Sequence, residues 1–203
     1  MFEVESSLYN NGHKHIACID EVGRGCLFGD VVACSIILPH NFTFLDVKDS
    51  KKLSAKKREF LYEVLTKESI AFGIGRVPSE VVDEINIKQA TRLAMKLAFE
   101  NMKDINGESL KPSYVLIDAE EIDVDIPQRA IIDGDNLVHG IAAASIVAKV
   151  FRDRLCIEWD SQFPGYDLAK NKGYGTKNHI DALKKFGATE LHRKSFLNNI
   201  IGR

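Results

Sequence analysis

The 203-residue chain predicts an α/β fold in which a mixed central β-sheet is flanked by helices. Two observations indicate this class. Short apolar runs of strand character come first and then alternate with helical segments, an order that joins early strands by hairpins and later strands by crossovers. Apolar residues make up 45% of the chain and charged residues 28%, which is ordinary globular composition and excludes disorder over the whole length. We expect one domain over 1–203.

Five strands are predicted from short apolar runs that are bounded by polar residues or glycine. The predicted strands lie at 16–19, 31–38, 69–77, 114–117 and 130–132. Because a hairpin joins antiparallel neighbours and a helical crossover joins parallel ones, this series predicts a mixed sheet.

Four helices are predicted, at 54–65, 88–102, 141–159 and 179–186. Ser54 is expected to cap the first helix, and Gly187 is expected to end the last. Before the second helix, Asn86 is either an N-cap or a contact to nucleic acid, and we favour the cap. From about residue 170 onward we expect a C-terminal helical segment that belongs to the same domain and contributes to substrate binding.

The cysteines and the apolar runs indicate the cellular compartment of the protein. None of the four cysteines forms a CxxC pair, and we interpret Cys18, Cys26, Cys34 and Cys156 as reduced structural thiols. The first twenty residues do not have the composition of a signal peptide, and the longest apolar run, 141–148, is too short to span a bilayer. We expect a cytoplasmic monomer with no membrane association.

Acidic residues follow three of the predicted strands: Asp20 and Glu21 the first, Asp118 the fourth and Asp135 the fifth. Strand ends meet at one edge of an α/β sheet, where ligands bind. Four carboxylates without nearby histidine or cysteine suit a hard cation such as Mg²⁺ or Mn²⁺. The alternative for any single aspartate is an ordinary turn or cap, which is how we interpret Asp123 and Asp125.

Glycine and basic residues form two further signals. Gly23, Arg24 and Gly25 (the glycine loop) directly follow the first acidic pair, and glycines let the backbone approach a ligand closely. Net charge is −2 overall but +6 over 170–203, and a second basic cluster stands at 51–58. Such local patches can bind a phosphate backbone, whereas the alternative is a solvated helix face. No GxxxxGK[ST] motif is present, which excludes a P-loop enzyme.

Six ordered motifs carry a resemblance to a known family. They are IDEVGRG at 19–25, DSKKLS at 49–54, YVLIDA at 114–119, GDNLVHGIAAASIVAKVFRD at 134–153, NKGYGTKNH at 171–179 and GATELHRKSF at 187–196. In order and spacing the chain resembles bacterial ribonuclease HII, over nearly its whole length. The resemblance implies a ribonuclease H-like fold with a C-terminal helical segment.

The resemblance also implies an activity. Family members are metal-dependent endonucleases that cut the RNA-containing strand of RNA/DNA hybrids. They also cut 5′ to single ribonucleotides in duplex DNA, leaving 3′-hydroxyl and 5′-phosphate ends, which suits ribonucleotide removal and primer clearance. The catalytic and metal-binding residues of the family correspond to Asp20, Glu21, Asp118 and Asp135, with two divalent cations, Mg²⁺ or Mn²⁺.

The substrate-binding residues of the family correspond to the glycine loop and to Tyr174, which would pack on the sugar beside the ribonucleotide. We expect phosphate contacts from Lys51, Lys52, Lys172, His192, Arg193 and Lys194. Ser145 and Lys149, one helical turn apart, are expected to face the site, although Ser145 could equally be a small helix-packing residue.

Three residues depart from the family pattern. Cys26 replaces a proline, which predicts a less rigid loop. Asp30 adds an acid near the phosphate path, and Asp133 is expected to face away from the metal site or to tune it.

Two rival classes fit the sequence less well. The sister enzyme, ribonuclease HIII, carries an extra N-terminal domain, for which the residues before the first strand leave no room. A nucleic-acid-binding protein with an inactive nuclease fold is disfavoured because all four acidic residues are present.

Overall fold

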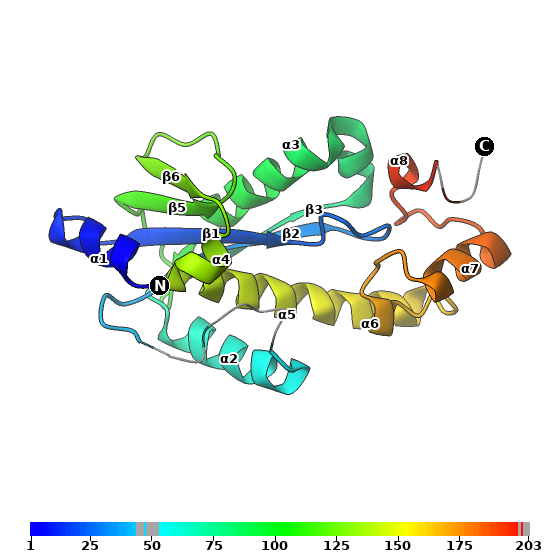
Figure 1. Cartoon of the computed structure of the whole chain (residues 1–203), viewed down its shortest axis with the longest axis horizontal. Coiled ribbons are helices and arrows are strands. Elements are labelled where there is room, and N and C mark those ends of the chain that lie inside the picture. The colour runs from blue at the N-terminus through cyan, green and yellow to red at the C-terminus, as the bar shows by residue number, and fades with distance from the viewer. Residues whose placement is uncertain (44–46, 48–52, 199, 201–203) are drawn as a thin grey trace.

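A six-stranded mixed sheet forms the centre of the protein in the computed structural model, which describes residues 1–43, 47, 53–198 and 200 (Figure 1). In the sheet the strands lie in the order β4-β3-β2-β1-β5-β6. The strands are β1 Ile16–Val22, β2 Val31–Ile37, β3 Ala71–Val77, β4 Lys103–Asp104, β5 Tyr114–Asp118 and β6 Gln128–Ile131. β1 to β4 pair antiparallel in succession, whereas β5 pairs parallel with both β1 and β6. The predicted mixed sheet is confirmed.

Eight helices are present in the described ranges. They are α1 Glu3–Asn10, α2 Ala55–Glu68, α3 Ser79–Glu100, α4 Gly134–Leu137, α5 His139–Gln162, α6 Leu168–Asn171, α7 Lys177–Phe186 and α8 Lys194–Leu197. The four predicted helices correspond to α2, α3, α5 and α7. The sequence analysis assigned no helix to α1, and none of the helices in the described ranges is long and apolar enough to cross a membrane.

Two helix caps were predicted correctly. The Ser54 hydroxyl accepts the N–H of Lys57 at 3.2 Å at the start of α2. Asn86 interrupts α3 with a left-handed φ of 68°, and its side-chain oxygen accepts the N–H of Lys88 at 3.0 Å. The second part of α3 therefore starts where the sequence predicted a helix, and Asn86 acts as its cap.

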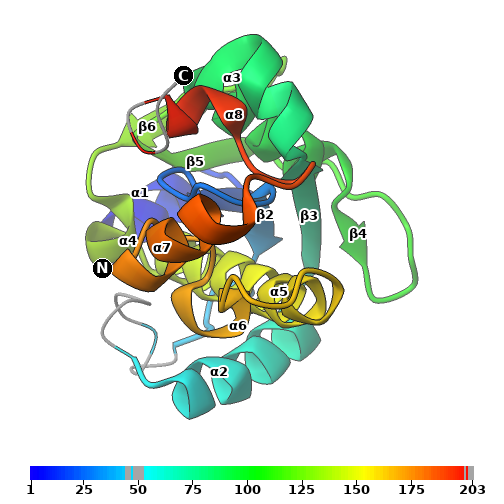
Figure 2. The same cartoon turned by 90° about the vertical axis from the view of Figure 1, so that its right-hand side faces the viewer.

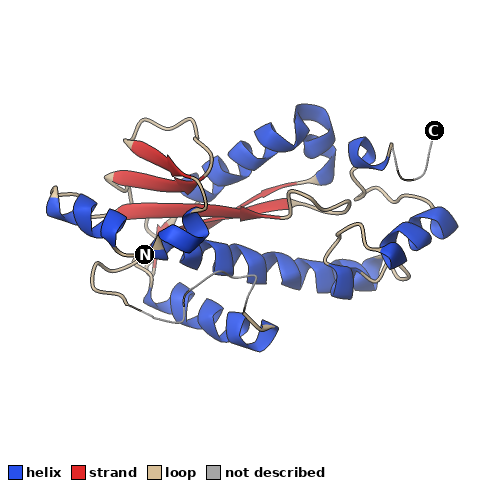
Figure 3. Cartoon of the chain, in the orientation of Figure 1, coloured by secondary structure: helices blue, strands red, loops and turns tan. Residues whose placement is uncertain are grey.

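β1 is buried on both faces, which explains its nearly continuous apolar sequence. Ile16 and Cys18 pack in the cluster that contains α5 residues, whereas Ala17 and Ile19 pack in the cluster that contains α3 residues. Figure 3 shows the sheet between these helices, with α2 lying outside α5. All four cysteines are free and buried, as predicted for structural thiols.

The C-terminal helices pack on the segment that joins β1 to β2 and so lie at one end of the sheet (Figure 2). Phe28 of that segment is buried together with Trp159 of α5 and Leu183 of α7. Tyr166, which lies between α5 and α6, belongs to the same cluster. Backbone bonds reinforce this packing: the Leu27 N–H donates to Gly173 O, and the Gly29 N–H donates to Leu191 O, both at 2.8 Å. The C-terminal segment thereby reaches the glycine loop.

Two fully buried arginines fasten the same segment. Arg152 of α5 donates to the carbonyl oxygens of Phe28 at 2.9 Å, Asp30 at 2.9 Å and Lys172 at 2.7 Å. Arg193 donates twice to Gly29 O, at 3.0 and 2.8 Å, and once to Arg24 O at 2.9 Å. A guanidinium offers five N–H donors in a fixed plane, so each arginine sets the path of several peptide groups at once.

Replacement of Arg152 tests this arrangement. We expect Arg152→Met to lower the free energy of unfolding by about 3 kcal/mol, because it leaves buried carbonyl groups without a donor. Arg154→Met on the same helix is the control: its side chain is 42% exposed and its ion pairs with Glu59 and Glu63 lie at the surface. That variant should lose less than about 1 kcal/mol. Equal urea midpoints for the two variants would contradict the prediction.

Candidate active site

The first acidic pair lies within β1, which continues to Val22 rather than ending at Ile19 as the sequence predicted. Antiparallel pairing with β2 continues through Asp20 and Glu21 to Val22. Consecutive residues in a strand point to opposite faces, but the two carboxylates here remain close enough to interact. Asp20 is buried and accepts a hydrogen bond from Ser145 of α5, and Glu21 pairs with Arg24 at 3.3 Å.

Asp118 completes an acidic cluster with Asp20 and Glu21. It is the last residue of β5, and its Oδ1 accepts the Gly134 N–H at 2.7 Å. One ligand atom from each of the three carboxylates lies within 4.8 Å of the others. Parallel pairing of β5 with β1 brings these strand ends together, as the sequence predicted.

A cavity of about 110 Å³ opens beside the acidic cluster. It is lined by Asp20, Glu21, Val22, Asp118, Asp135, Ser145, Lys149 and Tyr174. Asp135 sits on α4 rather than at a strand end and is not among the three carboxylates of the cluster. It nevertheless faces the same cavity, so the structure brings all four predicted carboxylates to one place.

Burial and mutual repulsion make this cluster unfavourable without a cation. Burial raises the pKa of Asp20 well above its usual range, and the neighbouring charges of Glu21 and Asp118 raise it further. Burial also raises the pKa of Glu21, while Arg24 opposes the rise. Within the described part of the chain, Oε2 of Glu21 is buried and has no hydrogen-bond partner. These residues fit a hard divalent cation, which would both satisfy that oxygen and neutralise the repulsion.

The glycine loop follows the acidic pair and is shaped by its contact with α5. Gly23 has a left-handed φ of 92°, and a Cβ there would overlap the Arg152 guanidinium. The Arg24 side chain is 41% exposed and lies between Glu21, at 3.3 Å, and Glu120, at 3.7 Å.

Glu120 is a residue that the sequence analysis missed. It is buried and also pairs with Arg92 of α3 at 2.9 Å. Ala119 precedes it with a left-handed φ of 52°, which breaks the strand alternation after Asp118. No periodicity could therefore have placed Glu120 beside Arg24.

Tyr174, on the C-terminal segment, lines the same cavity as the acidic cluster. Its side chain is 43% exposed, and its backbone forms a bridge with Cys26, next to the glycine loop. Lys149 also lines the cavity, and its Nζ pairs with Asp153 at 2.6 Å. Ser145 and Lys149 thus face the site, as predicted.

Two of the predicted phosphate contacts were wrong. His192 and Arg193 are buried, and their side chains bind other parts of the protein interior, where no phosphate can reach them. Of the remaining candidates, Lys194 is exposed, and Lys172 is partly buried with its Nζ donating to Ala169 O at 2.5 Å. Lys51 and Lys52 lie outside the described residues.

The three departures from the family pattern take up positions away from the cavity lining. Cys26 is buried, with Sγ 3.4 Å from Lys172 O. Asp30 is buried and pairs with Arg76 at 2.8 Å, so its charge is not directed at a phosphate path. Asp133 is exposed and accepts a hydrogen bond from Asn136 at 2.8 Å, and the same amide donates to Asp135 at 3.2 Å, so both expected alternatives for Asp133 stay predictions.

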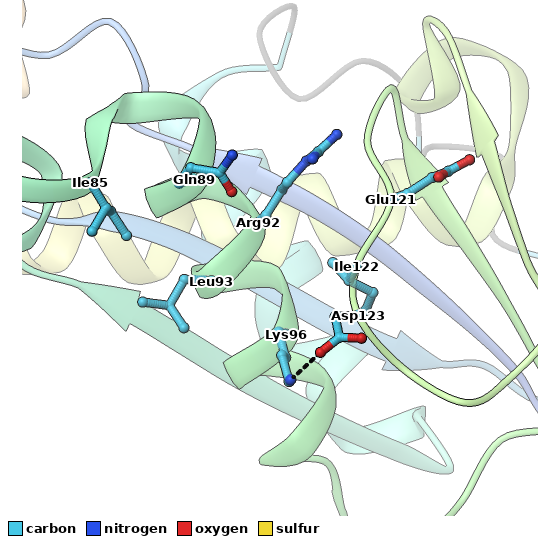
Figure 4. A pocket seen from close by; sticks show the side chains of 8 residues that line it. All are labelled: Ile85, Gln89, Arg92, Leu93, Lys96, Glu121, Ile122 and Asp123. Carbon is cyan, nitrogen blue, oxygen red and sulfur yellow. Dashed lines mark hydrogen bonds and ion pairs between the residues drawn. The ribbon is translucent and has the colours of Figure 1, made fainter.

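A larger groove of about 620 Å³ lies elsewhere, between α3 and the loop after β5 (Figure 4). It is lined by Ile85, Gln89, Arg92, Leu93, Lys96, Glu121, Ile122 and Asp123. Lys96 pairs with Asp123 at 3.1 Å, and Figure 4 shows Glu121 pointing away from both. Its carboxylates do not converge, so the groove lacks the chemistry of the smaller cavity.

Comparison with known proteins identifies the family. The family model described as Ribonuclease HII matches residues 17–199. A protein named Ribonuclease HII from Alkaliphilus oremlandii is 59% identical over 199 residues, which are 98% of this chain and 98% of that protein. The chain belongs to the ribonuclease HII family. As a member it is a hydrolase of the ribonuclease H type.

Further similarities agree with this membership. A Ribonuclease HII from Caldicellulosiruptor bescii is 49% identical over 98% of this chain and 95% of that protein. The crystal structure of ribonuclease H2 from Pyrococcus horikoshii superposes with a TM-score of 0.75 at 20% identity, covering 92% of this chain and 97% of that one. Bst-RNase HIII, solved in complex with Mn²⁺, gives 0.64 at 15% identity, covering 90% and 64%. These structures confirm the predicted ribonuclease H-like fold.

The raised pKa of Asp20 predicts that this ribonuclease HII site lowers the free energy of unfolding by an amount that depends on pH. Its ionised form is less favourable in the folded state, so stability falls as the pH rises through the folded-state pKa. In EDTA at pH 8 we expect Asp20→Asn to raise the free energy of unfolding by on the order of 1 kcal/mol. The gain should shrink as the pH falls toward about 4, near the ordinary aspartate pKa.

Urea unfolding at pH 8 and pH 5, with EDTA and with MgCl₂, measures this effect. Mg²⁺ should stabilise the wild type and leave Asp20→Asn nearly unchanged, because the variant lacks a ligand. A variant that is less stable than the wild type in EDTA at pH 8 would contradict the electrostatic account.

Proposed function

We propose that this protein is a metal-dependent endoribonuclease that hydrolyses the RNA strand of RNA/DNA hybrids and cuts 5′ to single ribonucleotides in duplex DNA. The products would carry 3′-hydroxyl and 5′-phosphate ends, which suits ribonucleotide removal and RNA primer clearance. The observation that carries the proposal is the acidic cluster, whose ligand atoms lie within 4.8 Å of one another beside the glycine loop and Tyr174.

Two divalent cations, Mg²⁺ or Mn²⁺, are proposed to bind between the acidic cluster and Asp135. When bound, such ions supply hydroxide near neutral pH and stabilise the leaving oxygen of an in-line displacement. Asp20 is central, because it is buried and interacts electrostatically with both Glu21 and Asp118. Ser145 would hold the Asp20 carboxylate in place through its hydrogen bond.

Selection of RNA must come from the 2′-hydroxyl, which is both a donor and an acceptor. The backbone of Gly23, Arg24 and Gly25 is proposed to bind this hydroxyl, since it directly follows Val22 of the cavity lining and two of its three residues have no side chain. Tyr174 is proposed to pack on the sugar of the next nucleotide, where a ring tolerates deoxyribose better than ribose. Its 43% exposure and its place in the cavity lining support that role.

Basic side chains around the cavity are proposed to position the duplex through its phosphates. Lys172 and Lys194 remain candidates in the described part of the chain, Lys149 is added because it lines the cavity, and the roles of Lys51 and Lys52 stay predictions. We propose that residues 1–203 act as one domain, that the C-terminal segment takes part in substrate binding, and that the protein is a monomer. Four free, buried thiols are consistent with a reducing, cytoplasmic setting.

The decisive experiment is cleavage of a labelled DNA duplex that carries one ribonucleotide, with all-DNA and RNA/DNA hybrid duplexes beside it, in Mg²⁺ and in Mn²⁺. We expect one cut 5′ to the ribonucleotide and none in the all-DNA control. Asp20→Asn should abolish cleavage while duplex binding survives, because it removes a metal ligand and no basic residue. Retained turnover of the variant in saturating Mg²⁺ would refute the four-carboxylate site.

Tyr174→Ala tests the reading of the RNA–DNA junction. We expect the variant to lose about tenfold in kcat/KM on the single ribonucleotide, because burying an aromatic side chain against a ligand contributes roughly 1.5–3 kcal/mol. The loss on a long RNA/DNA hybrid should be smaller, since the next sugar there is a ribose. Equal losses on both substrates would argue against this role.

A further inference from the structure

Two buried histidines of the C-terminal segment form a continuous hydrogen-bond chain that ends at Tyr174. His192 Nδ1 lies 2.9 Å from the backbone N–H of Thr189. His192 Nε2 lies 3.1 Å from His179 Nε2. His179 Nδ1 lies 3.0 Å from the carbonyl oxygen of Tyr174. Both side chains are almost completely buried.

The backbone groups at the two ends of the chain indicate where its protons lie. A backbone N–H can only donate, so Nδ1 of His192 accepts from Thr189 and its Nε2 carries the hydrogen. A carbonyl oxygen can only accept, so Nδ1 of His179 carries the hydrogen and its Nε2 accepts from His192. A proton added to His179 would face the Nε2–H of His192, and one added to His192 would face the Thr189 N–H. The Thr189 hydroxyl also lies 2.9 Å from Nδ1 of His192, but the backbone N–H donates to that same atom, so the arrangement favours the neutral pair.

The surroundings agree with a neutral pair. Burial lowers the pKa of His179, and burial together with the nearness of His179 lowers the pKa of His192 to about 4. Phe28 packs edge-on against the His192 ring, with centroids 4.7 Å apart. Tyr166 lies against the same ring at 5.0 Å.

This chain connects the two proposed substrate-reading elements. Phe28 and His192 form a backbone bridge, and Phe28 lies three residues after the glycine loop. At the other end, His179 fixes the carbonyl of Tyr174, whose ring lines the cavity with Asp20 and Glu21. A change in either histidine would move Tyr174 relative to the glycine loop without touching the acidic cluster.

We propose that His179 and His192 are positioning residues that set discrimination between a single ribonucleotide and a continuous RNA strand by fixing Tyr174 through proton-ordered hydrogen bonds. The inference rests on the proposed function, because it concerns the substrate choice of that same site. It assigns to His192 a role different from the phosphate contact expected from sequence.

Nitrogen NMR of the wild-type protein tests the hydrogen-bond chain independently of activity. At pH 7.5 we expect His179 to be the Nδ1–H tautomer and His192 the Nε2–H tautomer, with a scalar coupling between the two Nε2 atoms across the hydrogen bond. Charged rings, the opposite tautomers or the absence of that coupling would overturn the inference.

Kinetics of variants test the positioning role. His179→Ala should lower kcat/KM on the single ribonucleotide by about tenfold, the order expected for one lost hydrogen bond, and on the hybrid much less. His179→Asn, whose amide can still donate to Tyr174 O, should recover much of the ratio between substrates. Leu183→Ala is the control for loosened packing, since Leu183 is buried on the same helix but makes no such bond. It should leave the ratio unchanged.

A double-variant comparison identifies the route of the effect. In a Tyr174→Ala background, His179→Ala should no longer change the substrate ratio. A ratio change that persists without the tyrosine ring, or one that Leu183→Ala reproduces, would overturn the positioning role. An inactive wild type would instead refute the proposed function, whereas an active wild type with an unchanged ratio in His179→Ala refutes only this inference.

Discussion

The structure of the active site depends on two buried guanidinium groups that bind main-chain carbonyl groups. Arg152 and Arg193 enter the interior from α5 and from the C-terminal segment, and together they bind carbonyls of residues 24, 28, 29, 30 and 172. Their acceptors are peptide dipoles rather than carboxylates, so the charges are only partly compensated. Burial, with the charge of Arg152, lowers the pKa of Arg193 to about 10. The hydrogen bonds to the carbonyl groups replace the water that each guanidinium loses on burial. Displacing the carbonyl groups would leave a buried charge without partners, so the path of these peptide groups is held firmly.

That constraint explains why residues distant in the chain meet at one cavity. The sheet alone brings together the acidic cluster, because parallel pairing of β5 with β1 aligns their ends. The two arginines, together with backbone bonds between residues 26–29 and the C-terminal segment, hold the glycine loop and Tyr174 beside this cluster. The hydrogen bonds of His179 and His192 extend the same connection to the carbonyl of Tyr174. The metal-binding and the substrate-reading parts thus have separate structural supports.

The acidic cluster differs from the buried arginines in how its charge is compensated. Burial and like charge raise the pKa of Asp20, and a buried oxygen of Glu21 has no partner in the described part of the chain. Folding therefore assembles a site that favours neutralisation by a cation. At the border of the cluster, the positive charge of Arg24 is shared between Glu21, at 3.3 Å, and Glu120, at 3.7 Å.

Sequence by itself determined the sheet class and the main helices, because these depend on apolar periodicity. It also identified the four carboxylates that line the cavity, although only Asp118 stands at the end of its strand. It also determined the caps at Ser54 and Asn86, which are local interactions. Tertiary structure alone decided the roles of His192 and Arg193, which carry the same charge pattern as surface phosphate contacts but are buried. It likewise decided the place of Glu120 beside Arg24. Burial and backbone reversals depend on contacts between residues far apart in the chain, and local residue type does not encode them.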